Sequence, residues 1–242
     1  MSLPVLDRGP LRLAWAHDPA EGLRVGTVYG VLLNYRCALE ALGAAVNEPP
    51  YKAPPKAPVL YIKPRNTHRA DGAVVPVPDD APELEIGAAL GLVIGRTACR
   101  VAPADAQSYL AGYTVLIDVS VPHSVFYRPS IRFKARDGFC PIGPPVTACR
   151  PGLDPDDLTI RVSVDGAVRQ QASTSQLVRP VSRLLAEITD FMTLSPGDIL
   201  MVGVPVGAPL ARAGQSVAVE IDGVGRLQAR LQGQALFEGA AA

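Results

Sequence analysis

The sequence predicts a β-rich α+β domain, and three observations point to this fold class. Runs of β-branched and aromatic residues recur along the 242-residue chain, whereas only one segment carries a long helical repeat of apolar residues. These runs do not alternate regularly with helices, as they would in a doubly wound sheet. The chain also contains 22 glycines and 24 prolines, spread along its length, which indicates many tight turns.

We expect the chain to consist of an irregular arm over residues 1–24 and one domain over residues 25–242. Thr27 to Tyr35 is rich in β-branched and aromatic residues and predicts a strand, and the short helix that follows ends at Gly43. Prolines recur between Glu48 and Pro58 and exclude regular structure there, so we expect an ordered loop or a lid.

Further strands and helices follow from composition and spacing. The remaining strands are expected at Val59 to Ile62, Gly87 to Ile94, Tyr113 to Val121, Leu158 to Val164, Ile199 to Val204, Ser216 to Ile221 and Arg226 to Leu231. Asp165-Gly166 and Asp222-Gly223 separate such runs and predict hairpin turns. Apolar residues at helical spacing predict the longest helix over Pro180 to Met192, and a shorter helix is expected over Ala104 to Leu110.

Composition and charge exclude several classes of function. The chain has 23 Lys and Arg and 23 Asp and Glu, so its formal net charge is zero. It therefore lacks the long-range positive electrostatic field with which proteins that bind nucleic acids or anionic membranes attract their partners. We find no apolar core of a signal peptide, and no uncharged run reaches the roughly 18 residues of a membrane-spanning helix. We expect a cytoplasmic protein whose four cysteines, which form no Cys-x-x-Cys pair, are buried reduced thiols.

The basic segment Arg128 to Arg136 is the most informative local pattern. On a strand, Arg132, Lys134 and Arg136 would project from one face, because alternate residues of a strand share a face. Three cations together on a neutral protein suit a polyanionic ligand such as a dicarboxylate, which guanidinium groups bind in bidentate fashion. The alternative is a solvated sheet face with no specific role.

Asp118 lies in the middle of an apolar strand, where a carboxylate costs free energy unless it is paired, hydrogen-bonded or bound to a metal. The alternative to a functional role is a structural aspartate whose hydrogen bonds are satisfied. His123 follows Pro122 in an expected loop. No Ser, Cys or Asp stands at a nucleophile spacing from it, so we interpret this histidine as incidental.

Taken in order, the motifs of the chain resemble those of the fumarylacetoacetate hydrolase (FAH) family over about residues 25 to 232. The motifs are Leu33 to Tyr35, Tyr61 to Pro64, Leu92 to Gly95, Ala111 to Val115 with Asp118, Lys134 to Pro144, and Leu194 to Asp198. The resemblance implies an FAH-type mixed β-sandwich roll with a few short helices. It also implies a homodimer, or a hetero-oligomer with a paralogous FAH-family subunit.

One branch of the family is similar in three further segments, Tyr51 to Lys56, Ile62 to Thr67 and Phe126 to Pro129. They resemble the N-terminal half of the isomerase/decarboxylases of 4-hydroxyphenylacetate (homoprotocatechuate) degradation, in which two FAH folds are joined in tandem. The implied function is that of one subunit of a 2-hydroxyhepta-2,4-diene-1,7-dioate isomerase/5-carboxymethyl-2-oxo-hex-3-ene-1,7-dioate decarboxylase. Its substrates would be small unsaturated keto-dicarboxylates and keto-tricarboxylates.

The resemblance also implies a metal site, which this sequence matches at one ligand. Family members bind Mg²⁺ or another divalent ion with a Glu-x-Glu pair and an aspartate. Asp118 matches the aspartate, but the glutamate positions are Gly87 and Ala89. The nearby Glu83 and Glu85 lie four residues early, roughly 13 Å along an extended strand, so we do not expect them to replace the lost ligands. We therefore expect that this chain does not bind the Mg²⁺ of the family.

The other catalytic groups of the family are matched unevenly. At the positions of the family's His and Glu dyad, this chain has Ala38 and Ala41. The segment that is Thr-Gly-Thr-Pro in the family is Val202 to Pro205 here, and Pro122 stands where the family has an arginine after the aspartate. Lys134 matches the family's site lysine and is our catalytic candidate. The candidate substrate-binding residues are Arg128, Arg132, Lys63 and Asp137.

Three hypotheses about function follow from this pattern. The first is a metal-free isomerase/decarboxylase subunit that uses clustered basic side chains to stabilise a developing enolate. The second is a catalytically silent paralogue that stabilises a metal-bearing partner subunit. The third is another FAH-type hydrolase or an oxaloacetate decarboxylase. The missing histidine and glutamates argue against this hypothesis as strongly as they argue against an isomerase/decarboxylase.

Overall fold

The computed structural model describes residues 11–15, 22–123 and 130–234. Its largest sheet has eight strands. Along the sheet their order is β4 (Val59–Lys63), β3 (Val28–Leu32), β12 (Ile199–Met201), β7 (Glu83–Ile94), β8 (Leu110–Ser120), β9 (Cys140–Thr147) and β5 (His68–Arg69), and β13 (Leu210–Arg212) also pairs with β7. Within this sheet, β3 runs parallel to β12, whereas β7 pairs antiparallel with both β12 and β8.

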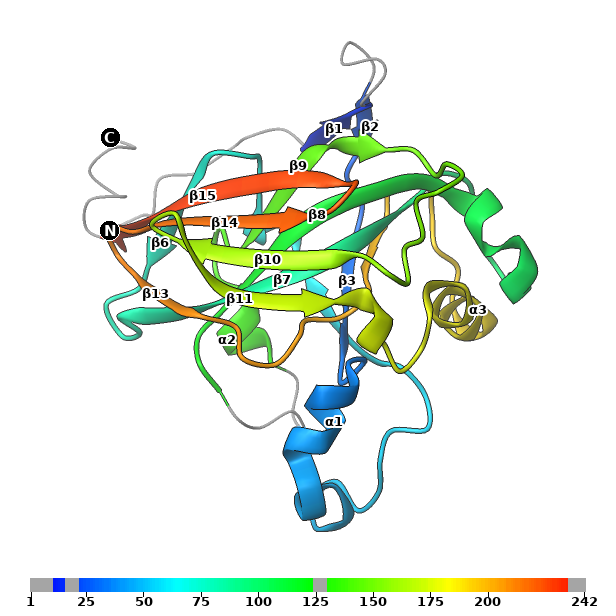
Figure 1. Ribbon diagram of the computed structural model, residues 1–242, viewed down its shortest axis with the longest axis horizontal. Coiled ribbons are helices and arrows are strands. Elements are labelled where there is room, and N and C mark those ends of the chain that lie inside the picture. Colours follow the sequence, from blue (N-terminus) through cyan, green and yellow to red (C-terminus); the bar gives the residue numbers. More distant parts are fainter. Residues whose placement is uncertain (1–10, 16–21, 124–129, 235–242) are drawn as a thin grey trace.

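A second sheet of five strands lies in front of β7 and β8 in Figure 1. Its strand order is β11 (Ala167–Ser173), β10 (Thr159–Val164), β14 (Ser216–Ile221), β15 (Gly225–Gly233) and β6 (Ala73–Val77). At the top of Figure 1, β1 (Arg12–Ala14) and β2 (Gly22–Arg24) form a separate two-stranded ribbon. The β-rich α+β fold class that the sequence predicts is therefore confirmed.

Short helices surround the two sheets. The α-helices are α1 (Arg36–Leu42), α2 (Ile131–Lys134) and α3 (Val181–Phe191), and the 3₁₀ segments are η1 (Gly43–Asn47), η2 (Arg65–Thr67), η3 (Pro103–Tyr109) and η4 (Thr174–Gln176). In Figure 1, α1 extends below the sheets while α3 packs at their side. None of the helices in the described ranges is long and apolar enough to cross a membrane.

Apolar side chains fill both sides of the central strands. One core lies between the two sheets and includes Leu90 and Ile117 from the large sheet and Val162 from the small one. A second core on the other face of the large sheet includes Ala89 and Leu116. Because both faces of β7 and β8 are buried, these strands are apolar almost throughout, and a charge within them needs a partner.

Several predicted elements are confirmed. The helix expected over Pro180 to Met192 is α3, and the short helix expected before Gly43 is α1. Both expected hairpins form, because β10 pairs antiparallel with β11 and β14 pairs antiparallel with β15. Residues 48–58 contain no helix or strand, as their prolines predict.

Other predictions need correction. The basic segment is not a strand, since residues 131–134 form α2 and Arg136 lies beyond it. All four cysteines are free, but only Cys140 is buried, and Cys99 is exposed. The expected short helix over Ala104 to Leu110 is the 3₁₀ segment η3.

Candidate active site

Asp118 stands at the centre of a buried cluster of charged groups. It lies on β8 directly opposite Gly87 on β7, and its side chain is 1% exposed. One carboxylate oxygen lies 2.6 Å from Lys63 Nζ, and the other accepts a hydrogen bond from Lys134 Nζ at 2.7 Å. The Tyr61 hydroxyl donates to that second oxygen at 2.5 Å. This carboxylate therefore has two ammonium partners and a phenol.

Lys63 is held by its surroundings as well as by Asp118. It lies on β4, its side chain is fully buried, and its Nζ donates to the carbonyl oxygens of Val119, Lys134 and Phe139 at 2.7, 2.8 and 2.9 Å. An ammonium group has three N–H donors, and here they face four oxygen atoms. Lys63, a candidate substrate-binding residue, is placed where it joins β4, β8 and α2 rather than where it faces open space.

Lys134 is positioned by a short helix, not by a strand. Its backbone N–H donates to Ser130 O at 2.9 Å, which closes the single turn of α2 and directs the side chain inward. Lys134 Nζ lies 4.9 Å from the centre of the Tyr61 ring, within the range of a cation–π contact. Unlike Lys63, Lys134 lines a pocket and retains 8% exposure of its side chain. It is therefore the ammonium group of the cluster that a ligand can reach.

Tyr61 owes its position to a glycine on the neighbouring strand. Gly30 on β3 pairs directly with Tyr61 on β4, and a Cβ at residue 30 would overlap the Tyr61 ring. The ring therefore lies flat across β3, and its hydroxyl reaches Asp118. Burial, with the adjacent carboxylate of Asp118, raises the pKa of Tyr61 well above its ordinary value, so the phenol stays a donor.

The ionisation of Asp118 follows from the same contacts. Burial alone would raise the pKa of its carboxyl, but the ammonium groups of Lys134 and Lys63 outweigh burial and hold the pKa below its usual range. Asp118 is thus a carboxylate at neutral pH. Burial lowers the pKa of Lys63, and the carboxylate of Asp118 acts against that shift. With both lysines protonated, the three side chains carry a formal net charge of +1.

A pocket of about 200 Å³ opens beside this cluster. Its polar lining comes from Tyr61, Glu85, Asp118, His123 and Lys134. The opposite wall is mainly apolar and consists of Val31, Leu32, Leu33, Ala38, Val204, Pro205, Val206, Gly207 and Ala208. The pocket thus combines a charged floor, where an anionic group would meet Lys134, with an apolar wall that suits a carbon chain.

The residues present do not fit a divalent cation. Gly87 and Ala89 share the face of Asp118 but carry no oxygen ligand, and a Cβ at residue 87 would lie 2.9 Å from both Asp118 O and Val204 Cγ1. Among the described residues, no group of three His, Cys, Asp or Glu side chains is placed to hold a metal ion. At 4 Å and an effective dielectric of 20, two like unit charges repel by about 4 kcal/mol, so the two ammonium groups disfavour any further cation beside Asp118.

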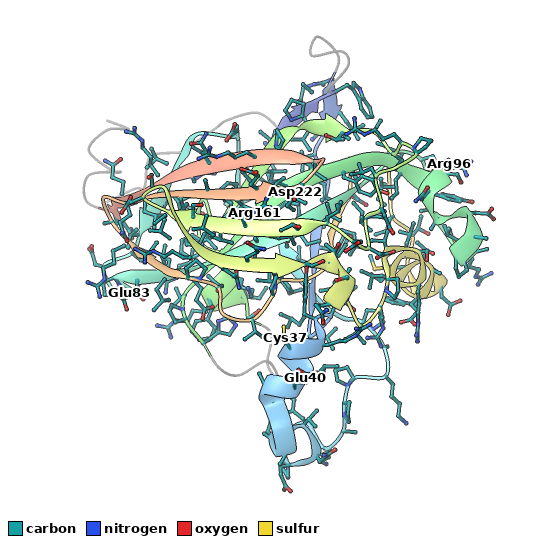
Figure 2. The ribbon with its side chains drawn as sticks, in the orientation of Figure 1. Cys37, Glu40, Glu83, Arg96, Arg161 and Asp222 are labelled. Atoms are coloured by element: carbon teal, nitrogen blue, oxygen red, sulfur yellow. The ribbon has the colours of Figure 1, made fainter. Side chains whose placement is uncertain are left out.

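The two nearby glutamates have separate surroundings. Figure 2 shows Glu83 at the outer end of β7, far from Cys37 and Glu40 on α1. Glu83 accepts a hydrogen bond from Arg212 Nε at 2.7 Å. Glu85 lines the pocket and accepts a hydrogen bond from Ser120 Oγ at 3.0 Å. Its Cα is two residues from Gly87, about 7 Å along the strand.

The remaining candidate residues are dispersed. Arg132 is exposed on α2 and does not line the pocket. Arg136, expected on the same face as Lys134, forms a bidentate pair with Asp80 at 2.6 and 2.9 Å. Asp137 is exposed and accepts a hydrogen bond from Asn66 at 2.7 Å. Arg128 lies outside the described residues.

Three polar members of the pocket lining, Tyr61, Glu85 and His123, are absent from the predicted site. Tyr61 was visible as part of a motif, and its i, i+2 spacing from Lys63 on a strand was the signal that both share a face. Glu85 was considered only as a metal ligand, although its pairing with Ser120, two residues after Asp118, places it on the same face. His123, interpreted as incidental, also lines the pocket.

Comparisons with known proteins agree with this fold. Residues 27–232 match a family model described as fumarylacetoacetate (FAA) hydrolase C-terminal. The chain is 41% identical over 198 residues to the 4-hydroxyphenylacetate degradation bifunctional isomerase/decarboxylase of Escherichia coli, an alignment that covers 82% of this chain and 45% of the relative. The chain thus spans about half the length of the curated relatives of this kind that it matches.

Solved structures show the same architecture. The 5-carboxymethyl-2-hydroxymuconate delta-isomerase of Mycobacterium smegmatis matches with a TM-score of 0.73 and 30% identity, covering 87% of this chain and 80% of that chain. The fumarylpyruvate hydrolase of Pseudomonas aeruginosa, in complex with Mn²⁺ and pyruvate, matches in fold with a TM-score of 0.79 and 24% identity, covering 93% and 97%. The chain therefore belongs to the fumarylacetoacetate hydrolase family.

Proposed function

We propose that this chain is one subunit of an isomerase/decarboxylase of 4-hydroxyphenylacetate degradation. Its substrates are small unsaturated keto-dicarboxylates and keto-tricarboxylates, and its partner is a second copy or a paralogous FAH-family chain. The 41% identity to the E. coli enzyme over 82% of this chain supports the assignment. The reactions are those of a 2-hydroxyhepta-2,4-diene-1,7-dioate isomerase and a 5-carboxymethyl-2-oxo-hex-3-ene-1,7-dioate decarboxylase.

One observation carries the chemical part of this proposal, namely the Lys134 ammonium group in the pocket, 2.7 Å from Asp118. Loss of CO₂ or of a proton from a 2-oxo acid leaves an electron pair that is delocalised as an enolate. A fixed positive charge in a site partly shielded from water stabilises that oxyanion as it forms. Asp118 and Tyr61 hold the ammonium group in place before the substrate arrives. No step in this account passes through a divalent cation.

A second candidate function is favoured by what this pocket lacks. Ala38 lines the wall where the family resemblance implies a histidine, and Gly87 and Ala89 replace the implied glutamates. On this reading, the chain is a catalytically silent paralogue that stabilises a metal-bearing partner. The buried charge cluster would then serve to hold β4, β8 and α2 together.

Assays with the purified chain separate the two candidates. If the isolated chain converts the keto acid, if Lys134→Met abolishes conversion and if a chelator does not, the chain is an enzyme in its own right. If conversion appears only after mixing with a second FAH-family protein and disappears with chelator, the silent-subunit function is correct. A chain that neither turns over substrate nor changes the activity or stability of such a partner would contradict both.

A further inference from the structure

A second pocket lies at the opposite end of β3 from the candidate active site. Its volume is about 320 Å³, and its lining includes Arg24 of β2, Arg65 of η2 and Thr27, which directly precedes β3. The pocket beside Lys134 is lined by residues at the other end of β3, and the two pockets share no lining residue. In Figure 1, β3 runs from the β1–β2 ribbon at the top to α1 below the sheets. A ligand of the second pocket would therefore bind apart from the candidate catalytic groups.

The charges of this pocket are not balanced within the chain. Arg24 and Arg65 are exposed, and among the described residues neither guanidinium group forms an ion pair or a hydrogen bond. Asp198 also lines the pocket, but its two carboxylate oxygens accept hydrogen bonds from the backbone N–H groups of Thr27 and Ser195, both at 2.8 Å. The pocket thus presents two free guanidinium groups and one carboxylate that is already engaged.

A third arginine adds to the positive charge beside this pocket. Arg12 on β1 lies directly opposite Arg24 on β2 in the antiparallel ribbon. Residues that are directly opposite in an antiparallel pair project from the same face, and like charges placed in this way destabilise the pair. The guanidinium group of Arg12 donates to Gly22 O, a neutral acceptor that does not offset its charge. Two opposed cations without an acidic partner indicate a role other than stabilising the ribbon.

Backbone contacts fix the two segments that carry these arginines. Gly197 has a φ of +91° and lies so close to Arg24 O that a Cβ at residue 197 would overlap this oxygen. The next residue but one, Gly26, donates its N–H to Gly197 O at 2.9 Å. On the other side of the pocket, the backbone N–H of His68 donates to Arg65 O at the end of η2. The backbone is thus ordered before a ligand arrives, which lowers the entropy cost of binding.

We propose that this pocket binds a small dicarboxylate at a site separate from the candidate active site, an inference that does not depend on the proposed function. A guanidinium group binds a carboxylate through two parallel N–H···O bonds, so Arg24 and Arg65 can each take one carboxylate of the same ligand. Leu11, Val25 and Pro196 supply apolar lining for the short carbon chain between the two carboxylates. A monocarboxylate would leave one guanidinium group without a partner.

Isothermal titration calorimetry at fixed ionic strength tests this site with succinate, and butyrate serves as a monocarboxylate of the same chain length. We expect succinate to bind the wild-type chain at least tenfold more tightly than butyrate. Arg24→Gln and Arg65→Gln should each weaken succinate binding at least tenfold. Arg24→Lys should weaken it less, because lysine keeps the charge and loses the planar fork. The matched control is Arg169→Gln on the exposed strand β11, which should bind succinate as the wild type does.

Two further measurements locate the ligand and separate binding from folding. Lys134→Met should leave the arginine-dependent binding in place, because the two pockets share no lining residue. Loss of succinate binding in Lys134→Met but not in the two arginine variants would place the ligand in the candidate active site and overturn the inference. Binding of butyrate or inorganic phosphate as tightly as succinate would overturn it as well. In urea unfolding, Arg24→Gln removes one of two opposed charges, so its midpoint should not fall; a lower midpoint would show that Arg24 serves the fold and not a ligand.

Discussion

Replacing Lys63 and, separately, Lys134 by methionine tests whether the two lysines of the cluster have different roles. Both ammonium groups contact Asp118, at 2.6 and 2.7 Å, but their other surroundings differ. Lys63 also donates to three backbone carbonyl oxygens and is fully buried, whereas Lys134 lines the pocket. Methionine keeps most of the side-chain volume in each case, so the change is mainly one of charge and hydrogen bonding.

The expected magnitudes follow from these contacts. Removing one partner of a buried ion pair costs about 3–5 kcal/mol, and Lys63→Met also leaves three carbonyl oxygens without their donor, so we place its cost in this range. Lys134→Met also removes an ion-pair partner of Asp118, but Lys134 lines the pocket, where water can replace its ammonium group, so we place its cost near that of one charge-assisted hydrogen bond, about 1.5–3 kcal/mol. The free energy of unfolding should therefore fall by about 2 kcal/mol more for Lys63→Met, which is the gap between the midpoints of the two ranges.

Urea unfolding at pH 7 measures this difference directly. We expect the midpoint to fall in both variants with an unchanged slope, and to fall further for Lys63→Met. The affinity for a 2-oxo acid should show the opposite order. Of the two variants, provided that both fold, Lys134→Met should lose more affinity than Lys63→Met. If Lys134→Met were as destabilising as Lys63→Met, or if ligand binding survived it, the division into a structural and a ligand-facing lysine would be refuted.

Two other predictions concern the same cluster. Gly30→Ala forces a Cβ into the Tyr61 ring, and this overpacking should lower the free energy of unfolding by about 1–3 kcal/mol. The control is Gly233→Ala, which has open space around its Cβ and should change the free energy of unfolding by less than about 0.5 kcal/mol. Equal effects of the two substitutions in urea unfolding would contradict the close contact between residue 30 and Tyr61. The second is that the stability gap between wild type and Asp118→Asn should be full at pH 7 and shrink in acid. The pKa of Asp118 is lower in the folded state than in the unfolded chain, where it is about 3.9. The ionised carboxylate therefore stabilises the fold fully above pH 3.9, and this stabilisation is lost as the pH falls toward the folded-state pKa. A stability gap that stays constant down to pH 2 would contradict the ion pairs.

Strands with regular alternation were the easiest part of the fold to predict. Ile160, Val162 and Val164 face the core between the sheets, and the predicted bounds of β10 are within one residue of those observed. The edge strand β11 was missed because its residues are largely polar and half-buried or exposed, so no apolar period marks it. The strands β1, β2, β5 and β13 have only two or three residues each, too few to show a period.

The basic segment shows why the site was harder to predict than the fold. Arg132 and Lys134 alternate as on a strand, but one helical turn places Arg132 in solvent and Lys134 in the interior. The requirement that Asp118 have a partner could be derived from its apolar strand. The identity of those partners could not, because Lys63 and Lys134 come from elements distant in sequence that only the fold brings together.

The motifs that carry the family resemblance mostly hold the scaffold. Asn34 donates to Val202 O at 2.7 Å and to Arg179 O at 3.2 Å, which connects the end of β3 with the segments after β12 and before α3. Asp198 accepts hydrogen bonds from the N–H groups of Thr27 and Ser195, both at 2.8 Å. Motifs of this kind therefore predict the fold, whereas the chemistry of the pocket depends on residues at other positions.

Binding of Mn²⁺ to the purified chain is the most direct test of the claim that Asp118 is committed to two lysines and not to a metal ion. Electron paramagnetic resonance measures the free aqueous ion, and we expect its signal to remain undiminished when one equivalent of protein is added. Loss of that signal with the wild-type chain, and its return with Asp118→Asn, would show that the carboxylate does seat a divalent cation and would contradict the account.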